Sequence, residues 1–167
     1  MENLMKKFIN IKRLFRSPKI RANVQFVLRD SQGRIKDYRE YHNLVTSAGK
    51  AGAASRINGA GSEAAFTYIA IGTGTNAAAA GDTTLQTEIS TGGGARTAAS
   101  CTRTTVTVTN DTAQLQVTFS FTSSFAVTES GAFNAGSSGV LLARRVFSAI
   151  NVANLDSLQV TWRYTIS

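Results

Sequence analysis

The chain has 167 residues, which is enough for one domain with a hydrophobic core and leaves little room for a second. One cysteine excludes an intramolecular disulfide, and with a single histidine it leaves too few ligands for a zinc or haem site. The net charge of +8 lies in residues 1–50, where 12 Lys+Arg face 4 Asp+Glu; residues 51–167 hold 6 of each. Such asymmetry indicates an arm that meets an acidic partner: nucleic acid, a membrane surface or a protein.

Residues 1–21 are predicted to form this basic arm. Leu4, Phe8, Ile11 and Phe15 follow helical spacing, so an amphipathic helix is expected to end near Ser17. Its apolar stripe needs a partner, and both its own domain and another subunit remain open as that partner. The candidate contact residues in the arm are Lys6, Lys7, Phe8, Lys12, Arg13, Phe15 and Arg16.

Two kinds of partner are not expected for the arm. Phe8 and Phe15 lie on its apolar stripe, where they are unavailable for stacking on bases, so nucleic acid is expected to make non-specific phosphate contacts at most. No stretch approaches the roughly 20 apolar residues that span a membrane, and charges interrupt the N-terminal segment too often for a secretion signal. A protein surface is therefore the expected partner.

Residues 22–60 are predicted to form a charged β-hairpin and an alanine-rich helix. Val24, Phe26 and Leu28 lie at alternate positions of one predicted strand, and a turn is expected over residues 30–33. The second strand of the hairpin is highly charged. It is expected to be a solvent-exposed edge, and the alternative is a contact surface. The helix is expected to be capped by Thr46 or Ser47 and to stop at residues 58–59, although two internal glycines weaken its signal.

Residues 61–167 are predicted to form an antiparallel β-sandwich or jelly-roll-like body. Strands are expected over residues 102–110, 114–121, 125–135, 140–150 and 157–166, with turns at residues 110–111 and 134–139. Each strand alternates apolar with polar residues, which is typical of a sheet with one buried face. Trp162 and Tyr164 fall on the apolar alternation and are therefore predicted to lie in the core.

The stretch TYIAIGTGTNAAAAGDT, residues 67–83, raises the possibility of a dinucleotide site. Gly72, Gly74 and Ala77 have the spacing G-x-G-x-x-A after a strand, as in nucleotide-binding folds. However, four alanines are too few for a crossover helix, and no acid stands about 20 residues further on. We therefore expect no cofactor. Gly72 and Gly74 are instead predicted to lie in a contact loop that lets another chain approach closely.

No constellation for catalysis is expected. His42 lies in the hairpin region, outside the body that holds Cys101, and Cys101 is predicted to be a small packing residue. The acids of the body are expected to serve turns and caps, and their spacing matches no calcium-binding loop. They are Glu63, Asp82, Glu88, Asp111, Glu129 and Asp156. The chain is therefore predicted to be neither an enzyme nor a metal protein.

Three stretches carry a family resemblance: residues 43–54, NLVTSAGKAGAA, residues 67–89, TYIAIGTGTNAAAAGDTTLQTEI, and residues 127–166, from VTESGAFNA through LLARRVF to LQVTWRYTI. Together they resemble a family of small virion structural proteins of tailed bacteriophages, described as capsid-associated or tail-fibre-like. Two positions depart from that family, which often has proline within residues 77–80 and a small or branched apolar residue at Ser130. The resemblance implies a structural role without catalytic residues.

The expected function is that of a capsid decoration or cement protein, a viral structural protein of the bacteriophage virion. It would form a homo-oligomer, with a trimer favoured, and bind the major capsid protein or another virion protein. Its place would be the virion, assembled in the bacterial host cytoplasm. A tail-fibre, baseplate or connector component is the alternative within this class, and a carbohydrate-binding module is the alternative from another class.

Overall fold

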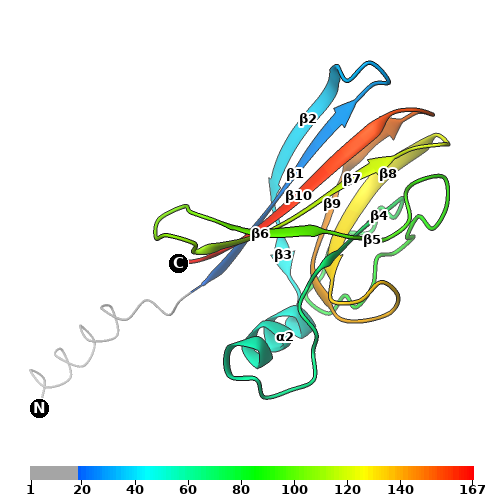
Figure 1. Cartoon of the computed structure of the whole chain (residues 1–167). Helices are drawn as coiled ribbons and strands as arrows, with labels where there is room; N and C mark the ends of the chain where they lie inside the picture. The colour runs from blue at the N-terminus through cyan, green and yellow to red at the C-terminus, as the bar shows by residue number, and fades with distance from the viewer. Residues whose placement is uncertain (1–18) are drawn as a thin grey trace, which may run out of the picture.

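Two antiparallel β-sheets packed face to face form the protein, as the computed structural model of residues 19–167 shows (Figure 1). The strands of sheet A are, in spatial order, β2 (Ile35–His42), β1 (Ile20–Arg29), β10 (Ser157–Ile166), β7 (Thr112–Ser120) and β6 (Ser100–Thr104). Those of sheet B are β3 (Leu44–Val45), β9 (Leu141–Val152), β8 (Phe125–Phe133), β4 (Tyr68–Gly72) and β5 (Thr97–Ala98). The predicted sandwich is confirmed, whereas the predicted N-terminal helix lies outside the described residues.

The core lies between the sheets, and the alternation of apolar residues along β1, β7 and β10 accounts for it. The inward side chains of these strands are almost completely buried, among them Phe26, Phe119 and Trp162. The Trp162 indole N–H donates to Ser130 Oγ at 3.2 Å, so the largest core side chain also has its polar atom satisfied. The prediction that Trp162 and Tyr164 lie inward is confirmed.

The predicted hairpin is confirmed, and it is an integral part of the sandwich. Strand β1 pairs with β10 along its whole length and with β2 on its other side. The ladder even extends by one residue, through two backbone hydrogen bonds between Lys19 and Ser167. Strand β1 therefore begins inside residues 1–21, the predicted arm. The Asp30 carboxylate closes the turn by accepting two backbone N–H groups at 2.9 Å.

Helix α2 (Ser47–Asn58) confirms the predicted alanine-rich helix. The Thr46 hydroxyl caps it by accepting the N–H of Gly49 at 2.8 Å, and Gly59 ends it in the left-handed conformation with φ 71°. Gly49, which weakens the sequence signal, packs directly against the backbone of Leu142, where a Cβ atom would overlap the carbonyl group. Within residues 19–167 no helix is long and apolar enough to cross a membrane.

The predicted strand over residues 102–110 is wrong in its second half. Strand β6 ends at Thr104, and the following residues form a turn that exposes Val106 and Val108. The Asp111 carboxylate accepts the N–H groups of residues 106–108 at distances between 2.7 and 2.9 Å. Threonine and valine favour strands, but this local carboxylate takes the backbone donors that a further stretch of ladder would use.

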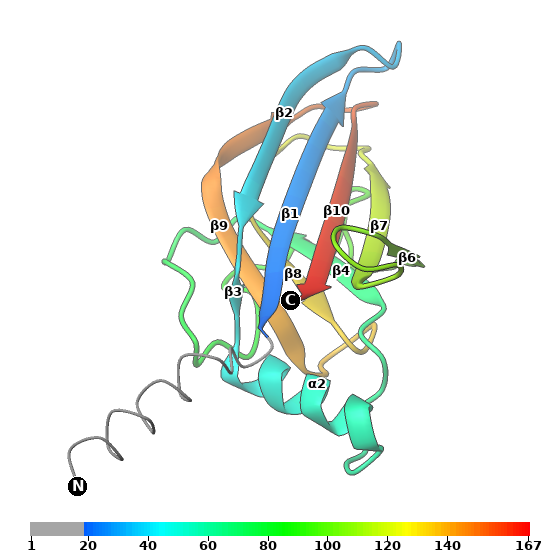
Figure 2. The ribbon, with the colours of Figure 1, turned by 90° about the vertical axis from the view of Figure 1, so that its left-hand side faces the viewer.

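The outer faces of the two sheets differ. In β8, residues 127–133 are all buried, so both faces of that strand are covered. Segment 73–96, which joins β4 to β5, covers sheet B and packs Leu85 with Phe133 and Leu141 in a small second cluster. In Figure 2 the view is onto sheet A, and neither this segment nor α2 crosses its strands β2, β1 and β10. Sheet A is therefore the layer with an open face.

Candidate functional site

The predicted contact residues divide into two groups. Those of the arm, Lys6 to Arg16, lie outside the described residues, and their contacts stay predictions. Gly72 and Gly74 are described, and both are buried. A Cβ atom added to either would lie 2.5 Å from Glu129 Oε1, so the close approach that these glycines allow is made within one chain. Contact of this loop with another chain stays a prediction.

Glu129 lies at the centre of a buried polar cluster. Its side chain comes from β8 and is completely buried. Oε1 accepts the N–H groups of Gly74 at 3.1 Å and Thr87 at 2.7 Å, and Oε2 accepts the N–H of Gln86 at 3.0 Å. Hydrogen bonds to an ionised carboxylate are about twice as strong as neutral ones. One side chain therefore ties both ends of residues 74–87 to sheet B.

Arg144, on the neighbouring strand β9, completes the cluster and is 3% exposed. Its Nε donates to Glu129 Oε2 at 2.9 Å, and its Nη1 donates to Asp82 at 2.8 Å. Its Nη2 lies 2.8 Å from Glu129 Oε2 in the ion pair and donates to the Asn76 carbonyl at 3.1 Å. Burial alone would lower the pKa of the guanidinium, but the two carboxylates raise it above its ordinary value. For Asp82, burial alone would raise the pKa, but the Ala79 N–H and Arg144 hold it below its ordinary value.

This cluster joins the phrases on which the resemblance rests. Its members come from IGTGT (Gly72, Gly74), GDTTLQTEI (Asp82, Gln86, Thr87), TESGAFNA (Glu129) and LLARRVF (Arg144). Ser130, beside Glu129, accepts from Trp162 of the closing phrase LQVTWRYTI. Both oxygens of Glu129 are already bonded within the chain, so the arrangement holds a loop and offers no free carboxylate for acid–base chemistry.

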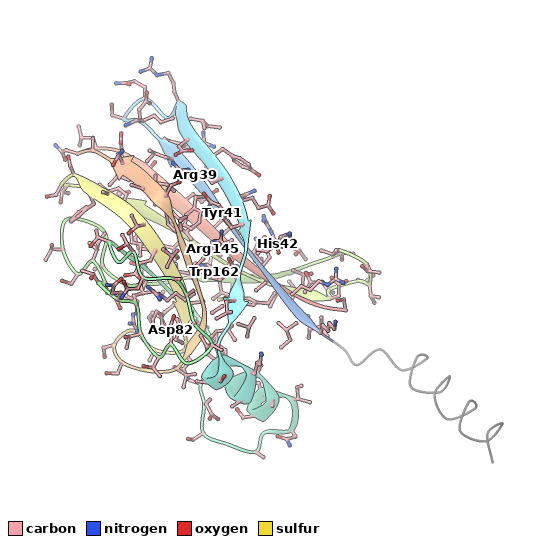
Figure 3. The ribbon with its side chains drawn as sticks, turned by 180° about the vertical axis from the view of Figure 1, so that it is seen from behind. Arg39, Tyr41, His42, Asp82, Arg145 and Trp162 are labelled. Carbon is pink, nitrogen blue, oxygen red and sulfur yellow. The ribbon has the colours of Figure 1, made fainter. Side chains whose placement is uncertain are left out.

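Side chains that Figure 3 labels close the side of the sandwich between β2 and β9. The Arg39 guanidinium donates to two carbonyl oxygens of β9, at 2.6 and 3.1 Å. The Tyr41 ring stacks on Phe147 with 5.9 Å between ring centroids, and the Arg145 guanidinium lies 4.7 Å from the Tyr41 centroid. Because Arg39 occupies these carbonyl groups, this edge is protected against pairing with another strand.

The open face of sheet A carries rows of polar side chains that run across its five strands. One row consists of His42, Asn23, Arg163, Gln114 and Thr102, and the next of Glu40, Gln25, Thr161, Gln116 and Ser100. Within the first row, Arg163 Nε donates to Gln114 Oε1 at 2.9 Å, and Asn23 Oδ1 lies 3.0 Å from His42 Nδ1. These rows are mostly uncharged and satisfy one another, so such faces of identical copies have little to repel each other.

His42 and Cys101 do not form a nucleophile and base. They lie on β2 and β6, the two opposite edges of sheet A, about 19 Å apart at four strand spacings. The prediction that Cys101 is a packing residue is wrong, because its side chain is exposed. Strand β5 of the facing sheet has only two residues and leaves the inner face of β6 uncovered. Desolvation raises the pKa of the Cys101 thiol, which favours its protonated form at neutral pH.

Asp82, Asp111 and Asp156 accept backbone N–H groups of turns, as predicted. Asp156 accepts the N–H of Ala153 at 2.9 Å, and its Oδ2 lies 2.6 Å from Lys36 Nζ. Asp111 holds the turn after β6. Glu88 and Glu129 are exceptions that serve neither a turn nor a cap: Glu88 pairs with Arg96 at 2.6 Å, and Glu129 lies inside a buried strand. Among residues 19–167, no group of three or more His, Cys, Asp and Glu side chains is placed to hold a metal ion.

Comparisons with protein-family models, with curated proteins and with solved structures gave no match for this chain. The functional inference therefore rests on the residues of the chain and on their geometry.

Sequence reasoning missed the pairing of Glu129 with Arg144. The signal for it is a charge placed in the middle of a stretch whose neighbours are small or apolar, as in VTESGAF and LLARRVF. A charge inside a buried strand needs an opposite charge nearby. Two such charges in consecutive predicted strands therefore point to each other, although the register that brings them together does not follow from spacing alone.

Proposed function

We propose that the protein is a non-enzymatic structural component of a tailed-bacteriophage virion, most directly a capsid decoration protein that reinforces the assembled shell. The observation that supports this most strongly is the convergence of the resembling phrases on one unit, the Glu129–Arg144 cluster and the core beside it. In that unit, the residues on which the resemblance rests serve to build a rigid body. The virion assignment itself comes from the resemblance.

The proposed mechanism is attachment through charge and burial. Residues 1–18 hold five basic residues and one acidic residue, a net charge of +4. They reach an acidic surface of the major capsid protein or of another virion protein, while the sandwich bodies assemble as a homo-oligomer, with a trimer as the expected state. Binding only to the assembled shell stabilises that shell by mass action.

Quantitative mass spectrometry of purified particles of the phage that encodes the chain tests this proposal. Hundreds of copies per particle support shell decoration. Six or twelve copies support the tail-fibre, baseplate or connector alternative, and absence from the particle contradicts both. The carbohydrate-binding alternative would need an aromatic platform other than Trp162 and Tyr164, which are buried in the core.

A further inference from the structure

One end of sheet A carries apolar side chains that residues 19–167 leave partly exposed. They are Ile20 (37% exposed), Val106 (64%), Val108 (66%) and Ile166 (61%). Ile20 and Ile166 are register partners of β1 and β10. The N–H of Ile166 donates to the carbonyl of Asp111, which is the residue that holds the turn of Val106 and Val108. All four residues therefore belong to one end of the molecule, at which β1 begins (Figure 1).

Ile20 and Ile166 continue the inward alternation of their strands beyond the core. Two residues further along the same faces, Ala22 and Tyr164 are buried, with 5% and 6% exposed. The Tyr164 hydroxyl, one row deeper, has no hydrogen-bond partner in the described chain. These are residues of a core-facing row that the second sheet does not reach. Apolar surface of this kind is characteristic of a contact with another molecule.

The turn that carries Val106 and Val108 is fixed in advance of any contact. Three backbone N–H groups donate to the Asp111 carboxylate, and the N–H of Asp111 donates to the carbonyl of Val108. A turn that is already ordered loses little conformational entropy when it binds, so the two valines are suited to act as anchors.

The same end carries basic residues without acidic partners. Lys19, Arg21, Lys50 and Arg103 are exposed, and none of the ion pairs found among residues 19–167 includes them. A hollow of about 370 Å³ is lined by Lys19, Ile20, Val45 and Lys50. At the opposite end of the sheet, by contrast, Arg34 and Lys36 are paired with acids of the chain. We name the four apolar and four basic residues together the arm-end surface.

We propose that the arm-end surface is the docking site for an acidic segment of a partner protein that carries apolar anchors. The partner's carboxylates pair with Lys19, Lys50 and Arg103, and its apolar side chains cover Ile20, Ile166 and the two valines. Charge complementarity selects this occupant: residues 1–18 are themselves net positive, so the basic rim repels them. That the partner is a virion protein rests on the proposed function. The chemistry of the site does not depend on it.

NMR of methyl groups in the full chain tests the site with defined probes. The first probe is an amphipathic peptide of leucine and glutamate, and the second is the same peptide with lysine in place of glutamate. We expect the acidic peptide to shift the methyl signals of Ile20, Val106, Val108 and Ile166. Ile35 and Leu155, which are 58% and 67% exposed at the far end of the sheet, are expected to stay unchanged. No shift, or equal shifts at both ends, overturns the proposal.

Two residues of one helix provide a matched pair of variants. Lys50→Glu reverses a charge of the arm-end surface in the first turn of α2, and Arg56→Glu makes the same change in its last turn. Lys50→Glu is expected to weaken binding of the acidic peptide at least threefold, and Arg56→Glu to leave it within a factor of two. The proposal is overturned if the two variants behave alike.

A further variant tests whether the chain covers this surface itself. Leu4→Ser with Phe8→Ser is expected to leave the signals of Val106, Val108 and Ile166 unchanged when no peptide is present. A change there shows that residues 1–18 occupy the surface, which overturns a partner as its occupant. The two proposals can fail separately. If the protein binds the acidic peptide but is absent from phage particles, the proposed function is refuted and the docking site is not. If the Lys50→Glu variant attaches to particles as well as the natural chain does, the docking site is refuted and the proposed function is not.

Discussion

At the scale of single residues, Glu129 and Arg144 explain why the segment over sheet B is ordered. A buried carboxylate and a buried guanidinium are each costly to desolvate, and they are tolerated together when their remaining hydrogen-bonding atoms are satisfied. Here the backbone N–H groups of Gly74, Gln86 and Thr87 provide that satisfaction. Gly74 is needed because any side chain would occupy the space of the carboxylate.

Replacing Glu129 by glutamine tests this cluster. The amide keeps the shape of the side chain, but in either orientation its NH₂ group faces N–H donors that now bond the carboxylate. Arg144 also loses its buried negative partner. Breaking a buried ion pair in this way typically costs about 3–5 kcal/mol. We expect a loss of that size in the free energy of unfolding, measured by urea denaturation. Glu40→Gln, an exposed change of the same kind, is expected to stay within about 0.5 kcal/mol, and an equal effect of both would contradict the role of the cluster.

At the scale of elements, the contact between α2 and β9 depends on a residue that looks unsuitable for a helix. Gly49 is buried against the backbone of Leu142, and the Thr46 side chain that caps the helix also donates to the carbonyl of Leu141 at 2.5 Å. The start of the helix is therefore fixed to the sheet by close packing and by one hydroxyl group that serves both elements.

Gly49→Ala is expected to destabilise the protein, although alanine is the better helix former by about 1 kcal/mol. The added methyl group overlaps the Leu142 carbonyl, and overpacking of this kind costs about 1–3 kcal/mol. Gly81→Ala serves as the control, since nothing lies within 4 Å of the added atom. Thermal unfolding of both variants measures the difference; stabilisation by Gly49→Ala would show that the helix does not touch the sheet here.

The turn after β6 predicts a pH dependence. Hydrogen bonds from three backbone N–H groups hold the pKa of Asp111 well below its ordinary value. A carboxyl group with a lowered pKa in the folded state stabilises the fold above its unfolded pKa of about 3.9, and this contribution is lost as the pH falls further towards the folded value. The melting temperature of the natural chain should therefore exceed that of Asp111→Asn by a constant amount above about pH 5, with the difference shrinking below about pH 4.

Calorimetry between about pH 2 and pH 7 measures this difference. Asp37→Asn provides a control, because Asp37 lies on β2 and takes no part in this turn. A difference that grows as the pH falls would be incompatible with a lowered pKa of Asp111.

At the scale of the whole molecule, the sandwich begins inside the segment that the sequence predicts as the arm, residues 1–21. The ladder of sheet A extends to Lys19, so residues 19–21 belong to the body. The sandwich has one covered sheet and one open sheet, and the arm-end surface lies where β1 begins. We expect such a body to present one neighbour with both the basic charge of residues 1–18 and a fixed apolar contact.

A chain that starts at Lys19 separates folding from attachment. We expect it to unfold cooperatively with a melting temperature close to that of the full chain, because every described strand is retained. Its attachment to phage particles should be strongly reduced, and attachment of the full chain should be weaker at about 0.5 M than at about 0.05 M salt. Co-sedimentation with particles measures both. A start at Val27 is the contrasting deletion, since it removes most of β1 and should abolish folding; full attachment of the chain from Lys19 would refute the role of the arm.

The sequence by itself determined the features that depend on neighbours along the chain. Alternation of apolar residues predicts β1, β7 and β10 because successive side chains of a strand point to opposite faces. The turn at residues 30–33 and the ends of α2 follow from local hydrogen bonds of Asp30 and Thr46 and from the freedom of Gly59. Each of these signals involves only residues close together in the chain, so it can be recognised from a single sequence.

Only the tertiary structure decided which side chains meet across the fold. Glu129 bonds Gly74, 55 residues away, through a register of sheet B that no local pattern encodes. The covering of sheet B, the exposure of Cys101 and the uncovered end of sheet A depend on how far each sheet extends over the other. Residues such as Ile20 and Cys101 carry the inward alternation of a core, and whether they are buried is settled by the length of the facing sheet rather than by their own sequence.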